Sequence, residues 1–528
     1  MNRLGLLALV AALALGVAEA RAETTVAPSR ACASMVGLKL PGSTMEITKA
    51  TAVAAAAPGT VRPSSFGPPI ASGVPPYCRV EGVMDRRTGL EGKAYAIKFA
   101  LALPDAWNGR FLFQGGGGLN GNVTPPFGAQ AAGDTPALAR GFAVVSTDSG
   151  HEGAVFDASF MKDQEAALNF AHASVGKVTA VAKAMVAAYY GRPAAHSYFD
   201  GCSTGGREAM LSSERYPDLF DGIVAGDPAM RTGNSNLGLG WASAAFNRAA
   251  AKDASGKPLT AQLYSPADKA LLVSSLLAAC DDLDGAKDGL IFDSARCRFN
   301  PAPLTCKGAK TDACLTAGQV AAVNEALAGP KTAGGVQAYS AFPWDTGLAS
   351  EGPGIPGFLP SAAPSILGPP SPATSMNVDE AVARVGADGT QSLVDTAAWT
   401  NLTSFFGHGG KILYYHGLSD PWFSPLDTLD YYQRLAPANG GEAAVRASAR
   451  MYLVPGMGHC QGGSATLDNF DLLSAVVDWV EQGKAPDSVV ATGRSMPGQS
   501  RPLCAWPAHA QYSGSGDPKD AASYQCRQ

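Results

Sequence analysis

The sequence predicts an α/β protein with a doubly wound, mostly parallel sheet and an inserted lid domain. Three observations predict this class. Short hydrophobic runs alternate with stretches of helical periodicity, as in strand-helix-strand units. The alternation is interrupted once, by a long segment that carries four of the ten cysteines. The chain of 528 residues is also too long for a single hydrophobic core, so at least two structural units are expected.

The chain begins with the pattern of a secretory signal. Arg3 precedes an apolar run at 4–17, and the small-residue pattern Ala20-Arg21-Ala22 follows it. The apolar run is too short to cross a bilayer of about 30 Å as a helix. We therefore expect residues 1–22 to be removed as a signal peptide and the mature protein to be periplasmic or secreted.

The charge of the chain excludes two classes of partner. The formal net charge is −5 at pH 7, which is mild for this length, and no long apolar run follows the signal. We expect no nucleic-acid partner and, after signal cleavage, no association with membranes.

The strands of the sheet are predicted from short β-type runs, several of them nearly continuously hydrophobic. Strands buried on both faces of a parallel sheet have this pattern. Apolar residues at helical spacing predict helices over 175–190 and 467–481. The six predicted strands are 110–114, 142–147, 197–200, 222–225, 411–416 and 450–454.

The strand-helix rhythm stops after residue 227 and resumes only at 411. We interpret 228–400 as an inserted lid domain, and 23–227 together with 401–528 as the catalytic domain. The ten cysteines favour disulfides in an exported protein, since no C-x-x-C spacing is present. Spacing alone leaves the pairing open, although short loops are plausible for Cys280 with Cys297, Cys306 with Cys314, and Cys504 with Cys526.

Residues 201–205 have the G-x-S-x-G pattern of a nucleophile elbow, which places Ser203 on a sharp turn between a strand and a helix. A serine needs a base to take its proton and a carboxylate to orient that base. In α/β-hydrolases the order along the chain is serine, acid, histidine. Asp420 and His459, each after a predicted strand, complete that order.

Each of these assignments has a competitor. Asp420 precedes a proline and so has the pattern of a simple turn former; Asp427 and Asp430 are the rival acids, but both fall in the next predicted helix. His416 is the rival histidine, interpreted as a strand-end residue that lines the site. Cys202 and Cys460 decide between them if they are bonded, because a disulfide holds its Cα atoms about 5.5 Å apart and would make Ser203 and His459 neighbours.

The negative charge of a tetrahedral intermediate needs backbone donors. One N–H is expected from Thr204, directly after the nucleophile, and another from the glycine run 115–118 that follows the first predicted strand. We favour Gly116, with the neighbouring glycines and a merely flexible loop as alternatives.

In combination, the segments 201–207, 415–420 and 454–460 resemble the tannase and feruloyl esterase family, which joins Cys-Ser and His-Cys through one disulfide. The resemblance runs from about Cys32 to Cys526, nearly the whole mature chain. It implies an α/β-hydrolase fold with five bridges, namely Cys32–Cys78, Cys202–Cys460, Cys280–Cys297, Cys306–Cys314 and Cys504–Cys526.

The same resemblance implies a structural Ca²⁺ ion in the lid and no organic cofactor. The loop 281–290 supplies oxygen ligands of the kind that Ca²⁺ prefers, although its spacing is not that of an EF-hand. A solvated acidic turn is the alternative from the residues alone. The implied ligands are the carboxylates of Asp281, Asp284 and Asp288 and the carbonyls of Ala286 and Leu290.

The family acts on small esters of aromatic acids, so the resemblance implies a galloyl, feruloyl or other hydroxycinnamoyl ester as substrate, with Trp422 or Phe423 facing the acyl ring. A close branch hydrolyses the half ester of terephthalate with ethylene glycol, whose free carboxylate needs a cation. No Lys or Arg lies between Lys331 and Arg384, which disfavours that alternative. Two further alternatives are a lipase-like enzyme for long acyl chains and an exported binding protein without activity.

Overall fold

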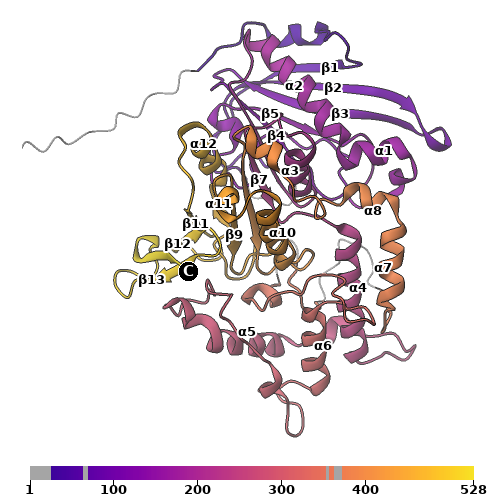
Figure 1. The fold of residues 1–528 in the computed structure, drawn as a ribbon, viewed down its shortest axis with the longest axis vertical. Helices are drawn as coiled ribbons and strands as arrows, with labels where there is room; N and C mark the ends of the chain where they lie inside the picture. The colour runs from indigo at the N-terminus through magenta and orange to yellow at the C-terminus, as the bar shows by residue number, and fades with distance from the viewer. Residues whose placement is uncertain (1–24, 64–68, 352–355, 362–370) are drawn as a thin grey trace, which may run out of the picture.

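The computed structural model describes residues 25–63, 69–351, 356–361 and 371–528. At its centre is a nine-stranded sheet with the strand order β1-β2-β3-β5-β4-β6-β7-β8-β9 (Figure 1). The strands are β1 (Glu46–Val53), β2 (Tyr77–Thr88), β3 (Ala94–Pro104), β4 (Arg110–Gln114), β5 (Ala143–Thr147), β6 (His196–Cys202), β7 (Gly222–Gly226), β8 (Lys411–Gly417) and β9 (Ala449–Val454).

The sheet is mixed, with parallel pairing from β5 through β9 and antiparallel pairing among β1, β2, β3 and β5. The predicted mostly parallel sheet is confirmed, and each of the six predicted strands is present within two residues of its expected ends. The antiparallel strands β1–β3 were not predicted.

Helices cover both faces of the sheet, because side chains alternate along each strand. In β4, Phe111 and Phe113 pack into the core on one face, and Leu112 packs into the core on the other. The first face is covered by α2 (Ser174–Tyr190), α3 (Thr204–Arg215) and α10 (Pro425–Ala438), and the second by α12 (Leu472–Gln482). Short helices α1 (Gln164–Leu168), α9 (Thr403–Gly407) and α11 (Glu442–Arg446) complete this part.

The segment 228–400 contributes no described strand to the central sheet and has a buried cluster of its own. Its helices gather at one end of the sheet (Figure 1). This arrangement is compatible with the predicted lid domain, whose boundaries remain predictions. The helices are α4 (Thr232–Ala249), α5 (Pro266–Cys280), α6 (Ala317–Ala328), α7 (Val378–Ala387) and α8 (Gly389–Val394).

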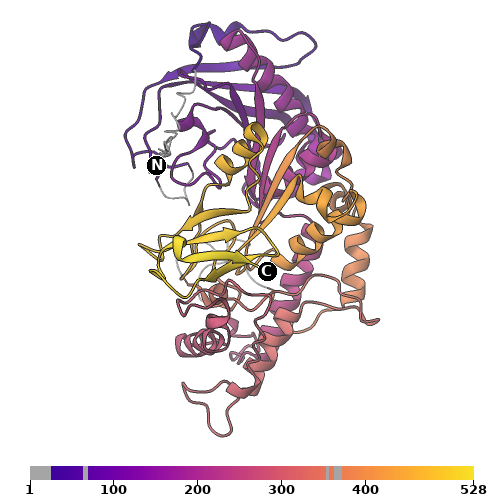
Figure 2. The same cartoon turned by 60° about the vertical axis from the view of Figure 1, so that its left-hand side comes forward.

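The prediction of a helix over 467–481 was wrong at its start. Residues 469 and 470 form the short strand β10 (Asn469–Phe470), and α12 begins at Leu472, because the Asp471 side chain accepts a hydrogen bond from Ser474 N at 2.9 Å and caps the helix there. After it come two small antiparallel sheets near the C-terminus, which Figure 2 shows in yellow. Their remaining strands are β11 (Ser488–Thr492), β12 (Ser500–Cys504), β13 (His509–Tyr512) and β14 (Tyr524–Arg527).

The predicted signal peptide, residues 1–22, lies outside the described residues. Among the residues that are described, no helix has both the length and the apolar character needed to cross a bilayer.

Candidate active site

Ser203 occupies the turn between β6 and α3, as the G-x-S-x-G pattern predicts. It is the only residue between the two elements, and it holds φ 64° and ψ −124°, a conformation that a non-glycine residue adopts only where its surroundings impose it. The flanking glycines allow the turn to pack closely. A Cβ on Gly205 would lie 2.7 Å from Gly116 O, and one on Gly206 only 2.1 Å from Gly226 O. Ser203 therefore sits on a strained elbow that no larger neighbours would permit.

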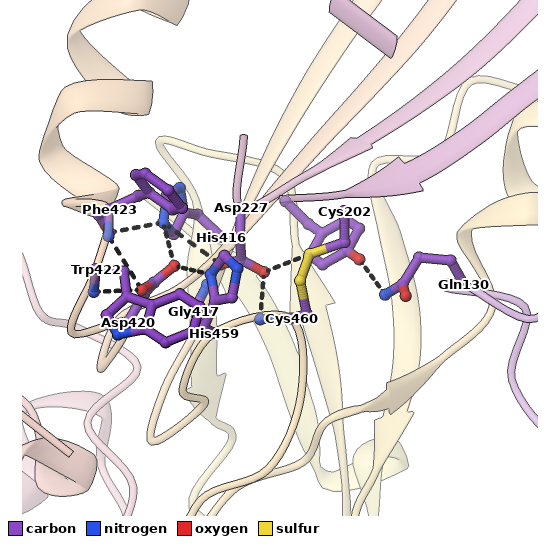
Figure 3. Close-up of a disulfide and its surroundings, with 11 residues drawn as sticks. Gln130, Cys202, Asp227, His416, Gly417, Asp420, Trp422, Phe423, His459 and Cys460 are labelled. Carbon is purple, nitrogen blue, oxygen red and sulfur yellow. Dashed lines mark hydrogen bonds and ion pairs between the residues drawn. A yellow bond between two sulfur atoms is a disulfide. The ribbon is translucent and has the colours of Figure 1, made fainter. Parts of the chain in front are cut away.

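The segment that carries His459 is bonded directly to this elbow. Cys202 and Cys460 form a disulfide with a Cα–Cα distance of 5.9 Å (Figure 3). Because Ser203 and His459 are the next residues along the chain from these cysteines, the bond joins the two segments at the site itself. The other four disulfides are Cys32–Cys78, Cys280–Cys297, Cys306–Cys314 and Cys504–Cys526, the pairs that the family resemblance implied.

Asp420 orients His459. The His459 ring contacts Asp420 Oδ2 through Nδ1 at 2.7 Å, and both side chains are buried. The other carboxylate oxygen of Asp420 accepts hydrogen bonds from the backbone N–H groups of Trp422 (2.8 Å) and Phe423 (3.1 Å). His459 Nε2 has no hydrogen-bond partner within the described chain. That nitrogen is the one a serine hydroxyl needs as its proton acceptor.

Burial raises the pKa of the Asp420 carboxyl, but the two imidazoles beside it, His459 and His416, outweigh burial and hold the pKa well below its usual range. Asp420 is therefore ionised at neutral pH. The rival acids are engaged elsewhere on α10: Asp427 pairs with Arg231 (Nε–Oδ2 2.9 Å), and Asp430 with Arg434 (2.8 Å).

The structure argues against Gly116 as the oxyanion donor. Its N–H donates to Glu208 Oε2 at 2.9 Å, so it is already occupied by a carboxylate. Glu208, in the second turn of α3, also accepts from Asn120 Nδ2 at 2.7 Å and so fastens the glycine run to the nucleophile helix. The next glycine, Gly117, faces open space. Thr204 is the first residue of α3, where a backbone N–H has no partner within the helix.

The two predicted aromatic side chains lie against the histidine. Ring centroids are 4.9 Å apart for Trp422 and His459, and 5.3 Å apart for Phe423 and His459 (Figure 3). Phe156, which sequence reasoning missed, meets Trp422 edge to face at 6.2 Å, with 38% of its surface exposed. Its neighbour Val155 lies beside Gly118 of the glycine run. In the sequence, the only signal was an apolar Val-Phe pair shortly after Gly150 and Gly153.

His416 was expected to line the site, but it is fully buried behind Asp420. Its Nε2 lies 3.3 Å from Asp420 Oδ2 and 3.4 Å from Asp227 Oδ1. Asp227, at the end of β7, was missed altogether. Its φ of 34° is positive, which is rare for a residue before a proline. Its carboxylate oxygens accept hydrogen bonds from Gly417 N and Cys460 N (Figure 3).

The loop predicted to bind Ca²⁺ presents a donor set that fits a hard cation. Burial is the main cause that raises the pKa of Asp284 to about 7, and the charges of Asp288 and Asp281 add a smaller rise. The three carboxylates do not converge within 4.8 Å of one another. Asp288 also pairs with Arg501 of β12 (Nε–Oδ2 3.1 Å), which ties the loop to the C-terminal strands.

Comparison with known proteins agrees with this geometry. A family model described as "Tannase and feruloyl esterase" matches residues 78–359 and 370–527. A mono(2-hydroxyethyl) terephthalate hydrolase of Piscinibacter sakaiensis is 38% identical over 522 residues, covering 86% of this chain and 85% of the relative. Feruloyl esterase B of Aspergillus niger is 30% identical, covering 80% and 82%. The crystal structure of feruloyl esterase B from Aspergillus oryzae superposes with a TM-score of 0.75 and 26% identity, covering 94% of this chain and 99% of that one.

Proposed function

This chain belongs to the tannase and feruloyl esterase family, and we propose that Ser203, His459 and Asp420 are the nucleophile, base and acid with which it hydrolyses carboxylic esters of aromatic acids. The observation that carries the proposal is the position of His459. Asp420 holds its Nδ1, its Nε2 has no partner among the described residues, and the disulfide joins the adjacent residue to the nucleophile elbow.

The reaction proceeds in two steps. Ser203 Oγ attacks the ester carbonyl while His459 Nε2 takes its proton, and the imidazolium then returns that proton to the departing alcohol. Water attacks the acyl-enzyme in the same way, with His459 again as base, and releases the acid. Asp420 fixes the tautomer of His459 that leaves Nε2 free to accept.

The oxyanion is held by backbone N–H groups. Thr204 N–H remains our proposed first donor, and Gly117 replaces Gly116 as the proposed second, because the Gly116 N–H donates to Glu208. One such donor contributes roughly 10²-fold to the rate.

Aromatic acyl groups are favoured by the walls of the site. Trp422 and Phe423 place two aromatic rings against the imidazole of His459, and Phe156 packs edge to face on Trp422. Flat rings pack on such walls edge to face or offset-stacked. The relatives named above act on feruloyl and terephthalate esters, which are aromatic. The terephthalate half ester stays an alternative substrate: the similarity to its hydrolase favours it, while Arg384, the nearest cation along that part of the lid, is exposed on α7.

A panel of esters tests the proposal. Purified mature protein, oxidised and supplied with Ca²⁺, is assayed on methyl ferulate, methyl gallate, mono(2-hydroxyethyl) terephthalate, a generic aryl acetate and a long-chain acyl ester. We expect an aromatic ester to give the highest kcat/KM. Preference for the long chain would support a lipase-like enzyme, and failure on every ester would support a binding protein.

We also propose that the 281–290 loop binds Ca²⁺ as a structural ion, with Asp281, Asp284 and Asp288 as its acidic ligands and the carbonyls of Ala286 and Leu290 as the others. The ion supplies no chemistry; it neutralises crowded carboxylates and steadies the loop. Removal of the ion by a chelator should lower Tm, whereas the activity of the protein that stays folded should change little. Restoration by Ca²⁺ but not Mg²⁺ is the expected result, and an unchanged Tm would contradict it.

Export to an oxidising compartment, periplasmic or extracellular, accords with the five disulfides. The N-terminal residue of the protein recovered from cells tests this proposal. A sequence that begins at residue 23 is expected, and retention of residues 1–22 would contradict it.

A further inference from the structure

The carboxylate of Asp420 faces two imidazoles, only one of which the reaction uses. Behind it lies His416, whose Nε2 is 3.3 Å from Asp420 Oδ2, 3.4 Å from Asp227 Oδ1 and 3.0 Å from the carbonyl oxygen of Phe423. These partners are oxygens that only accept hydrogen bonds. His416 Nε2 must therefore carry a hydrogen.

The second ring nitrogen also has a partner that allows a hydrogen. His416 Nδ1 lies 2.9 Å from Thr428 Oγ1, a hydroxyl oxygen that can accept. Ligand atoms of Asp227, His416 and Asp420 all lie within 4.8 Å of one another, and all three residues are fully buried. Two carboxylates at this distance, away from water, need either a cation between them or a proton on one of them. His416 is the group placed to supply the cation.

We propose that His416, held by Asp227, is a buried imidazolium that positions Asp420 and keeps the catalytic His459 neutral between turnovers. The proposal rests on the proposed function, since it concerns the same catalytic base. His416 and Asp227 contact no substrate and act through Asp420 and His459, so both are positioning residues.

The balance of charge gives the reason. With His416 protonated, the two aspartates and two histidines together hold one negative charge at rest and none when His459 takes the serine proton. With His416 neutral, two negative charges would surround His459 at rest and hold a proton on it. A base that is already protonated cannot accept a proton from Ser203.

The pKa shifts of His416 and Asp227 bear on this assignment. Burial lowers the pKa of His416, but the carboxylates of Asp227 and Asp420 outweigh it and raise the pKa above its ordinary value. Burial raises the pKa of Asp227 to about 6, against the opposing effect of His416. The raised pKa of His416 favours its imidazolium form, and a pKa of about 6 leaves most of Asp227 ionised at pH 7.

Among the described residues, two phenols also face the group formed by Asp227, His416, Asp420 and His459. Tyr339, from the inserted segment, feels the charge of Asp420, and Tyr415, on β8, feels that of Asp227. Burial raises the pKa of both phenols well above the ordinary value, so both stay neutral. Arg231 and Asp427, which also act on Tyr339, are paired with each other.

Asp227 has a second role, at the disulfide. Its Oδ2 accepts the backbone N–H of Cys460 at 3.0 Å and lies 3.4 Å from Cys202 Sγ, while its Oδ1 accepts Gly417 N at 2.7 Å (Figure 3). Asp227 thus connects the turn after β8 with the segment that carries His459. The same carboxylate holds the imidazolium and the backbone beside the base.

Two near-isosteric substitutions test the proposal through the pH profile of kcat/KM. His416→Gln removes the positive charge and should move the acidic limb to higher pH by about one unit, with kcat lowered at pH 6 to 7. Asp227→Asn removes a negative charge and should move the limb to lower pH. Opposite shifts are not expected from loss of structure alone. The proposal is overturned if both variants fold and the acidic limb moves in neither of them, or if it moves in the same direction in both.

Asp345→Asn is the matched control. Asp345 is a buried carboxylate that accepts from Gly456 N at 2.7 Å and from Ser419 Oγ, and so holds the same two turns; no histidine nitrogen is among its partners in the described chain. It should lower Tm without moving the limb. If His416→Gln does not fold, Asp227→Asn and a histidine-labelled ¹⁵N spectrum of the wild-type protein decide. The spectrum should show a persistent imidazolium at pH 7, and its absence overturns the proposal. Lack of esterase activity in the wild-type protein would instead reject the proposed function.

Discussion

Three residues of the site hold conformations with positive φ: Ser203 at 64°, Cys460 at 67° and Asp227 at 34°. Each is a non-glycine residue, for which this region of φ carries a strain of about 1 kcal/mol or more. Ser203 directly follows Cys202, which is bonded to Cys460. Asp227 accepts a hydrogen bond from the backbone N–H of Cys460. Strain at the level of single residues is thus concentrated around the Cys202–Cys460 bond.

At this scale the sequence predicted that Ser203, Asp420 and His459 belong to one site, because each follows a strand in a recognisable turn; their catalytic roles stay a proposal. It did not predict Asp227, His416 as a partner of Asp420, or the loss of the Gly116 N–H to Glu208. Those roles depend on side chains from distant segments, and spacing along the chain carries no information about them.

Trp422→Ala tests the aromatic wall. Because the Trp422 ring lies against His459 and Phe156, its loss should lower kcat/KM for an aromatic acyl ester about tenfold more than for an acetyl ester, which corresponds to about 1.4 kcal/mol. Substrate panels on the two esters measure the ratio. Trp399→Ala, an exposed tryptophan, is the control and should leave the ratio unchanged. Equal losses on both esters for Trp422→Ala would contradict the assignment.

At the scale of elements, β4 to β9 were predicted and β1–β3 were not, although β2 and β3 are largely buried. Strand β4 could be predicted from only five residues, because its side chains enter the core on both faces and its sequence is therefore hydrophobic at successive positions. Strand β1 buries little beyond Ile47, so its sequence has neither a continuous hydrophobic run nor a clear alternation. The C-terminal strands β11, β13 and β14 are short and partly exposed, so their sequences also lack a pattern that predicts a strand.

The connection between the glycine run and α3 has its own test. Glu208→Ala leaves the Gly116 N–H and the Asn120 amide without their acceptor, which should destabilise the protein by about 1–3 kcal/mol and lower kcat about tenfold through a displaced oxyanion loop. Denaturant unfolding and steady-state kinetics measure the two effects.

Glu214→Gln is the matched control on the same helix. Glu214 Oε1 is buried and has no hydrogen-bond partner in the part of the chain that the structure describes. Burial raises the pKa of this carboxyl well above its ordinary value, so a neutral side chain should be tolerated. If Glu208→Ala and Glu214→Gln had equal effects on kcat, Glu208 would have no special role at the loop.

Asp148, which directly follows β5, gives stability a pH dependence. Burial raises its pKa to about 7, against hydrogen bonds from Gly150 N and Lys98 N. The unfolded chain has an Asp pKa of about 3.9, so this carboxyl favours folding fully below that pH and the benefit is lost as pH rises through about 7. The change that Asp148→Asn makes in the free energy of unfolding, relative to wild type, should therefore be more favourable at pH 8 than at pH 5 by about 2 kcal/mol.

Urea unfolding at the two pH values checks this, with Asp105→Asn, an exposed aspartate, as control. A difference between variant and wild type that is the same at pH 5 and pH 8 would show that Asp148 does not titrate in this range.

At the scale of the whole molecule, covalent and ionic bonds join parts that are far apart in the sequence. The Cys202–Cys460 bond spans 258 positions and encloses the entire insertion. The loop at 281–290 joins the insertion to the C-terminal strands through Asp288 and Arg501, and Tyr524 also donates to Asp288 at 3.3 Å. The fold class was predictable because strand-helix alternation is local, whereas these long-range links came only from the family resemblance or from the structure.

Replacing Cys202 and Cys460 together by serine tests the central link. Chain-entropy arguments give a loss of about 5 kcal/mol for a closed loop of this length. Activity should fall further than the folded fraction does, because nucleophile and base are no longer held together. Cys306→Ser with Cys314→Ser, which opens a loop of 8 positions in the insertion, is the control and should keep activity per folded molecule. Activity that merely follows the folded fraction in both variants would limit the bond to a structural role.

The most direct measurement is covalent labelling with a fluorophosphonate, followed by peptide mapping of the oxidised mature protein. The predicted result is one adduct, on Ser203, which disappears in Ser203→Ala and forms much more slowly in Asp420→Asn. An adduct on another residue, or full esterase activity with Ser203 unlabelled, would contradict the assignment of nucleophile, base and acid.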